Sequence, residues 1–142
     1  MTRDPKSKNK MYLILDPGAL TGFLCFMVVN QRGGKLLKVS IKKQCISIEL
    51  LLAKVSKALA IKKLSFKDIA GIAVVQGGES FSTVRGVHAI ANALGWSLQV
   101  PVCSLADCAK GAIQNAISHC RLKKRFHLLL PQYSREPNIT IA

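Results

Sequence analysis

The chain has 142 residues and a formal net charge of +14 at pH 7, because 21 lysines and arginines face only seven carboxylates. Nearly half of the residues (49%) are apolar, which excludes a disordered chain and predicts one folded domain. Such a basic excess favours a polyanionic partner, RNA or DNA. Lysines that only keep the protein in solution would give the same count.

Apolar runs long enough to cross a bilayer are absent, since the longest uncharged one covers residues 23–29. The amino end lacks the order of regions of a signal peptide, and five cysteines in mostly apolar segments are typical of reduced thiols. We therefore expect a cytoplasmic protein without membrane contact. Cys103, Cys108, His119 and Cys120 do not follow a zinc spacing, so no metal and no cofactor is expected.

The amino-terminal part predicts three strands after a basic tail of residues 1–10. Apolar runs at residues 11–15, 23–29 and 35–41 have the length and composition of buried strands. Residues 30–34 carry turn chemistry and join the second strand to the third as a hairpin.

The remainder alternates between helices and strands. Leu51, Val55 and Leu59 fall on one face of a helix predicted over residues 47–61. The later elements are a strand at 71–75, a helix at 80–94, a strand at 98–102, a helix at 104–117 and a basic tail at 118–142. The order β-β-β-α-β-α-β-α predicts a single α/β lobe over residues 11–117, with a mixed sheet of the ribonuclease H-like type found in actin and sugar kinases (the ASKHA fold).

The predicted helix after Ser80 has three faces. A bulky stripe expected to lie on the sheet consists of Val84, Val87, Ala91 and Leu94. A polar stripe, with His88 expected in a polar or interface rim, consists of Arg85, His88 and Asn92. A stripe of small side chains consists of Ser82, Gly86, Ala89 and Ala93. Glycine inside a helix costs about 1 kcal/mol relative to alanine, so Gly86 requires a close packing partner. That partner is either the chain's own first helix or a helix of another subunit.

The turn Gly77-Gly78-Glu79-Ser80 precedes this helix. A helix start can bind phosphate, but no Lys-Ser/Thr follows the glycines and the Glu79 carboxylate would repel an anion. A tight turn with Ser80 as helix cap is the favoured interpretation.

Several segments resemble one known family in their order and spacing. The segments are Leu13-Ile14-Leu15-Asp16, Phe66-Lys67-Asp68-Ile69-Ala70-Gly71-Ile72-Ala73-Val74, Ser80-Phe81-Ser82-Thr83-Val84-Arg85, Leu94-Gly95, Val100-Pro101-Val102, Ser104-Leu105 and Leu130-Pro131-Gln132-Tyr133-Ser134-Arg135-Glu136-Pro137. They are similar to the TsaB family, also called YeaZ. This family is the bacterial partner subunit of the enzyme that places threonylcarbamoyl on the adenosine next to the tRNA anticodon.

The chain also departs from that family. The family turn normally reads Gly-Pro-Gly-Ser-Phe-Thr-Gly-x-Arg, whereas this chain has Gly78, Glu79 and Thr83 at three of its positions. Family members usually carry a second lobe after the Ser-Leu segment, where this chain has only a short helix and a basic run. The resemblance therefore implies a one-lobed form without the nucleotide cleft that lies between two lobes.

The resemblance implies a non-catalytic scaffold that pairs with a TsaD-like catalytic subunit through its first two helices, or with a second copy of itself. The expected interface residues are Leu50, Ala53, Lys57, Ser82, Arg85, Gly86, Ala89 and Ala93. The dense basic run is expected to contact tRNA through Arg121, Lys123, Lys124 and Arg125.

Two other functions remain open. Leu15-Asp16-Pro17-Gly18 followed by Thr21-Gly22 resembles the first catalytic strand of a RuvC or ribonuclease H-like nuclease. Two-metal chemistry needs further carboxylates at the same sheet end, and the strand at 71–75 is followed by Gln76 instead. A small basic RNA-binding module is the third possibility, although its few aromatic residues fall mostly at strand or core positions rather than where they would stack on bases.

Overall fold

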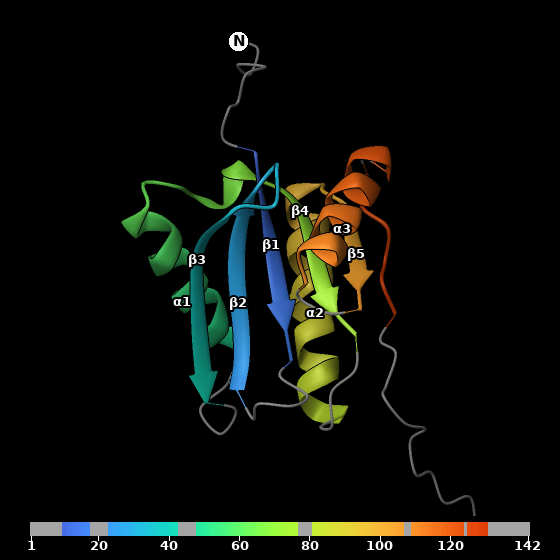
Figure 1. Cartoon of the computed structure of the whole chain (residues 1–142). Helices are drawn as coiled ribbons and strands as arrows, with labels where there is room; N and C mark the ends of the chain where they lie inside the picture. The colour runs from blue at the N-terminus through green and yellow to red at the C-terminus, as the bar shows by residue number, and fades with distance from the viewer. Residues whose placement is uncertain are drawn as a thin grey trace, which may run out of the picture.

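One mixed sheet organises the computed structural model, which describes residues 10–17, 23–42, 48–76, 81–106, 109–123 and 125–130. The strands lie in the order β3-β2-β1-β4-β5. Their bounds are β1 Met11–Asp16, β2 Phe23–Asn30, β3 Lys35–Lys42, β4 Ile69–Val75 and β5 Val102–Leu105. β2 is antiparallel to β1 and β3, whereas β1, β4 and β5 run parallel to one another (Figure 1). The predicted α/β fold with a mixed sheet is confirmed.

Helices cover both faces of this sheet. α1 (Ile48–Ile61) and α2 (Phe81–Leu98) pack on one face, and α3 (Lys110–Lys123) packs on the other (Figure 1). A short 3-10 helix, η2 (Phe66–Asp68), leads into β4. Within the described ranges, no helix is long and apolar enough to span a membrane.

The continuous apolar run of β1 follows from its central position. Leu13 and Leu15 belong to the core beneath α1 and α2, whereas Tyr12 and Ile14 belong to the core beneath α3. All four side chains are buried. A strand covered on both faces reads as an unbroken apolar segment rather than an alternating one, which is why residues 11–15 were recognisable as a buried strand.

The predicted strand at residues 98–102 is wrong because α2 continues to Leu98 and ends in a helix cap. Gln99 takes the left-handed conformation (φ 57°), its N–H donates to the Trp96 carbonyl (3.3 Å), and the Val100 N–H donates to the Gly95 carbonyl (3.0 Å). This is the Schellman pattern of hydrogen bonds. The strand starts only after Pro101, whose carbonyl accepts the N–H of Ile72 in β4 (3.0 Å).

Gly95 lies inside α2, one residue beyond the predicted end of this helix at Leu94. An added Cβ would collide with the side chain of Val102 in β5 and come within 2.9 Å of Cδ1 of Phe126. The missing side chain therefore lets α2 approach both β5 and the segment that follows α3.

The predicted helix at residues 104–117 is displaced toward the carboxyl end. Ser104 and Leu105 pair in parallel with Val74 and Val75 and so belong to β5. α3 runs through Lys123, which places Arg121 and Lys123 in the last turn of a helix rather than in the expected tail.

Residues 125–130 return along α2 and are fixed there by the Asn92 side chain. Its Nδ2 donates to the Leu129 carbonyl (2.9 Å), and its Oδ1 accepts the Leu129 N–H (2.9 Å). Phe126 and Leu129 pack against the core on the α1 and α2 side. Figure 1 shows this segment in red, on the β5 side of the sheet.

The expectation of buried thiols is confirmed for the cysteines whose side chains are described. Cys25, Cys103 and Cys120 are buried, and the sulfurs of Cys103 in β5 and Cys120 in α3 lie 3.1 Å apart. They join α3 to the sheet as part of its apolar contact.

Two glycines of α2 should respond oppositely to alanine. Gly95→Ala should lower the free energy of unfolding by about 1–3 kcal/mol, because the added methyl group overpacks the contact with Val102. Gly86→Ala should raise it by about 1 kcal/mol, because a Cβ there meets no described atom within 4 Å and alanine favours the helix. Urea unfolding of both variants measures this, and a Gly95→Ala variant as stable as the wild type would contradict the close approach.

Candidate protein–protein interface

The side of α2 turned away from the sheet carries the small-residue stripe. Ala89 and Ala93 are exposed, and Gly86 is half-buried. A Cβ added at Gly86 would meet no described atom within 4 Å, so no described side chain of α1 packs on this glycine. The sequence left open two partners for Gly86, and the described residues of the chain's own first helix do not act as one. The Ser82 side chain lies outside the described residues.

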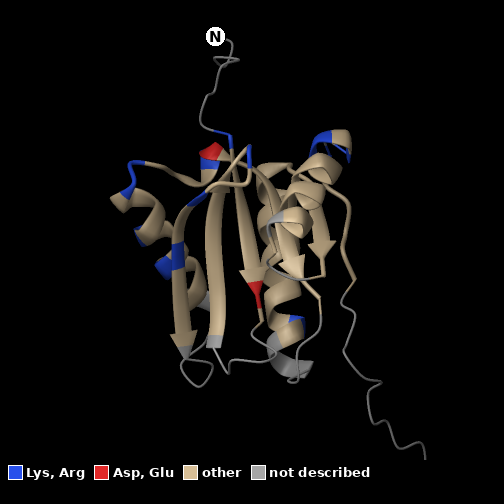
Figure 2. Ribbon diagram, viewed as in Figure 1, with Lys and Arg blue, Asp and Glu red and all other residues tan. Residues whose placement is uncertain are grey.

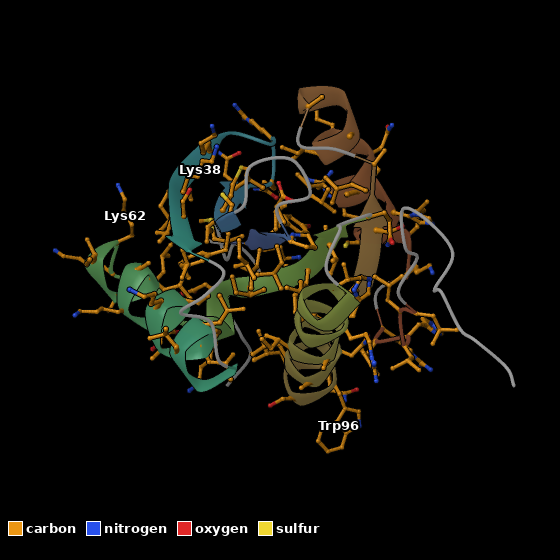
Figure 3. The ribbon with its side chains drawn as sticks, turned by 90° about the horizontal axis from the view of Figure 1, so that it is seen from below. Lys38, Lys62 and Trp96 are labelled. Atoms are coloured by element: carbon orange, nitrogen blue, oxygen red, sulfur yellow. The ribbon has the colours of Figure 1, made fainter. Side chains whose placement is uncertain are left out.

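Trp96 extends this stripe, and the sequence analysis missed it. It follows Ala89 by seven residues and Ala93 by three, which places the three side chains on one face of the helix. Its side chain is 67% exposed and points away from the sheet (Figure 3). The spacing was available in the sequence, but the helix was ended at Leu94, before the tryptophan.

α1 lies beside α2 on the same face of the sheet (Figure 3). Its apolar side, with Leu51, Val55 and Leu59, is buried against the sheet. Among the predicted interface residues, Leu50 is half-buried, and Ala53 and Lys57 are exposed. Ile61, four residues after Lys57, is 75% exposed and is a further apolar side chain at this end of α1.

The predicted polar stripe of α2 is only partly correct. Arg85 is exposed, but His88 is buried with 2% of its surface exposed, and Asn92 is bonded to Leu129. The expectation that His88 lies in a polar or interface rim is therefore wrong. One turn after His88, the hydrogen bonds between Asn92 and Leu129 show that a distant segment of the chain packs along this side of α2, which spacing within the helix does not predict.

The buried imidazole of His88 is held in one tautomer. Its Nδ1 lies 2.8 Å from the Val84 carbonyl oxygen, one turn earlier, and donates to it. Its Nε2 is buried without a hydrogen-bond partner among the described residues. Burial lowers the pKa of His88 below its ordinary value of 6.5, and the bond to Val84 only partly opposes that effect.

The basic run near the carboxyl end lies away from this interface, on the α3 side. Arg121 and Lys123 are exposed in the last turn of α3, and Arg125 is exposed just after it. Lys124 lies outside the described residues.

The structure also shows the end of the sheet at which a ribonuclease H-like nuclease would hold its metal ions. β1 and β4 are neighbouring parallel strands, so their carboxyl ends lie at the same end of the sheet. Asp16 is the last residue of β1, and Gln76 follows the last residue of β4. The Gln76 N–H donates to the Leu105 carbonyl (2.9 Å), which continues the pairing with β5. In the described ranges no set of three or more His, Cys, Asp or Glu side chains could hold a metal ion. The turn at residues 77–80 lies outside the described residues.

Comparisons with known proteins support the fold. Two solved structures from Pseudomonas aeruginosa are similar: an uncharacterized protein with similarity to peptidase YEAZ (21% identity, TM-score 0.59) and YeaZ itself (22% identity, TM-score 0.56). Each comparison covers 69% of this chain and 44% of the other chain. No protein-family profile and no curated protein matches. The chain therefore shares a YeaZ-like, ASKHA-type fold and spans less than half the length of these neighbours.

The buried His88 predicts a pH dependence of stability. Because the pKa is depressed in the folded state, the unfolded chain takes up the proton first, and the free energy of unfolding should fall as the pH drops below 6.5. His88→Phe should remove this part of the pH dependence, whereas His119→Gln, at an exposed position of α3, should retain it. Urea unfolding between pH 7.5 and 5.5 tests this. Equal pH slopes for wild type and His88→Phe would contradict it.

Proposed function

We propose that this chain is a non-catalytic scaffold subunit similar to TsaB, which pairs with a TsaD-like catalytic subunit of the tRNA threonylcarbamoyladenosine-forming complex. The observation that supports this most is the open outer side of α2. The space over Gly86 is empty of described atoms, and Trp96 is 67% exposed at the end of the same stripe.

This surface suits the docking of another helix. Glycine, which lacks a side chain, and alanine, which has only a methyl group, let two helix backbones approach closely. The ridges of one helix can then fit the grooves of the other. A tryptophan at the end of such a stripe supplies the large apolar contact that often dominates binding energy. α1 widens the surface with Ala53, Lys57 and Ile61.

The chemistry would lie in the partner subunit. Gln76 stands where a ribonuclease H-like nuclease needs its second carboxylate, so the described residues at this end of the sheet do not favour two-metal cleavage by the chain itself. The assignment to tRNA modification rests on the motif resemblance together with the YeaZ-like fold.

Co-purification tests the pairing. The tagged chain would be co-expressed with the TsaD-like protein of the same organism, and the complex would be isolated and its mass determined. Recovery of a stoichiometric complex would support the proposal. Recovery of the chain alone, or only as a homodimer, would contradict the proposed pairing with a TsaD-like subunit.

Arginine in the small-residue stripe should block this assembly. Ala89→Arg or Ala93→Arg places a long charged side chain where two helices would meet, and burying it unpaired should cost several kcal/mol. Because both positions are exposed, the monomer should stay folded by circular dichroism. Asn115→Arg, an exposed position on α3, is the matched control and should assemble normally. If light scattering reports unchanged complexes for both stripe variants, the interface lies elsewhere.

The isolated chain should neither hydrolyse ATP nor bind it tightly. The resemblance implies that nucleotides bind between two lobes, and the Glu79 carboxylate in the turn before α2 would repel phosphate. Calorimetric titration should give no measurable heat of binding at micromolar ATP. Micromolar affinity would contradict this expectation.

A further inference from the structure

Basic side chains from separate elements meet at the end of the sheet where β1 begins. The hairpin between β2 and β3 and the carboxyl end of α3 lie at this end, which is the upper end in Figure 1. Arg32 and Lys35 come from the hairpin, and Arg121 and Lys123 come from the last turn of α3; all four are exposed. We name these four residues the basic end.

Of the two carboxylates with described side chains, one lies at this end of the sheet and one at the other. Asp16 and Asp68 are the acidic residues whose side chains the structure describes (Figure 2). Asp16 is the last residue of β1 and lies at the opposite end of the sheet. The Asp68 carboxylate accepts the Ser65 N–H at 2.9 Å, which occupies one of its oxygens in capping η2.

The hairpin and α3 are held together although they are far apart in sequence. Nη2 of Arg121 donates to the Gln31 carbonyl (3.3 Å), and Nε2 of Gln114 donates to the Arg32 carbonyl (3.5 Å). Gly33 takes a positive φ of 85°, and a Cβ there would lie 3.4 Å from Cγ of Gln114. The hairpin thus approaches α3 closely at the position where glycine is required.

The hairpin is also ordered internally. The Asn30 Oδ1 accepts the N–H groups of Arg32 and Gly34, each at 2.9 Å. The cations of the basic end are therefore carried by two elements fixed to each other, and the bond to Gln31 leaves other guanidinium N–H groups of Arg121 available.

We propose that the basic end is an RNA-binding surface that contacts the phosphate backbone through Arg32, Lys35, Arg121 and Lys123. The proposal rests on the proposed scaffold function and deepens it, because it adds the hairpin to the tRNA contact expected from α3 alone. α3 lies on the opposite face of the sheet from α1 and α2, so RNA and a protein partner could bind at once (Figure 1).

RNA fits this surface better than a membrane. Proteins that bind anionic lipids through a helix insert its apolar face among the acyl chains. Most of the apolar side of α3, with Ile113, Ile117 and Cys120, is buried against the sheet instead, and among the described residues of this helix Leu122 is the single large apolar side chain that is exposed. The phosphate backbone of RNA supplies closely spaced negative charges that the cations of two elements fixed to each other can contact together.

Binding of a 5′-labelled tRNA transcript, measured by fluorescence anisotropy in 0.1 M KCl, tests the proposal. The hairpin pair Arg32→Gln/Lys35→Gln and the helix pair Arg121→Gln/Lys123→Gln should each weaken binding about tenfold and reduce the steepness of the log–log salt dependence by about 1.5. The matched pair Lys38→Gln/Lys54→Gln also removes two exposed charges, and it should bind within about twofold of wild type. Lys38 is labelled on β3 in Figure 3 and lies about 10 Å along the strand from Lys35, which is one screening length in 0.1 M salt.

Arg121→Lys keeps the charge while weakening the bond to Gln31, and it should bind RNA nearly as the wild type does. Loss of binding in this variant would mean that docking of the hairpin, rather than phosphate contact, sets the affinity, and would overturn the proposal. Equal weakening by all three pairs would also overturn it, because the effect would then come from diffuse charge. So would tighter binding to phosphatidylserine vesicles or to polyglutamate than to tRNA.

The outcome is separable from that of the scaffold proposal, because the assay contains no catalytic subunit. RNA binding through the basic end without capture of a TsaD-like protein would support the RNA-binding proposal and contradict the scaffold proposal. Capture of that protein without RNA binding would do the reverse.

Discussion

The structure depends on one constraint: the central strands β1 and β4 must be covered on both faces. Leu13 and Ile72 point into the core beneath α1 and α2, whereas Ile14 and Ala73 point into the core beneath α3. A sheet of this kind needs helices on both sides to remove its apolar surface from water. Gly95 satisfies the same requirement locally, since its missing side chain lets α2 approach Val102 at the edge of the sheet.

This two-sided packing divides the outer surface into regions of different chemistry. The side with α1 and α2 presents small and apolar groups at Ala89, Ala93 and Trp96. The end with the hairpin and α3 presents cations at Arg32 and Arg121. A scaffold that holds a protein on one side and RNA on the other needs this separation, because both ligands can then bind without competing.

Much of the fold could be predicted wherever it depends on patterns among residues that are close in sequence. The apolar runs gave the strands at residues 11–15 and 71–75 correctly, and helical spacing gave the buried side of α2 with Val84, Val87 and Ala91. Boundaries failed where a contact between distant residues decided them. Nothing near Gly95 in sequence indicates that Val102 and Phe126 lie against it, and the predicted helix ended one residue before this glycine.

The candidate sites followed the same rule. The stripe at Ala89 and Ala93 was predictable from spacing within one helix, whereas Trp96 was lost with the misplaced helix end. The burial of His88 and the contact of Arg121 with Gln31 were not predictable, because each depends on segments that meet only after folding.

Hydrogen–deuterium exchange of the chain, with and without the TsaD-like protein of the same organism, tests the central claim most directly. The outer helix surface would be covered in the complex, so backbone amides of α1 (Ile48–Ile61) and α2 (Phe81–Leu98) should exchange more slowly, while α3 (Lys110–Lys123) should be unchanged. Protection confined to α3 and the β2–β3 hairpin, or no protection at all, would contradict the assignment of α1 and α2 as the docking surface.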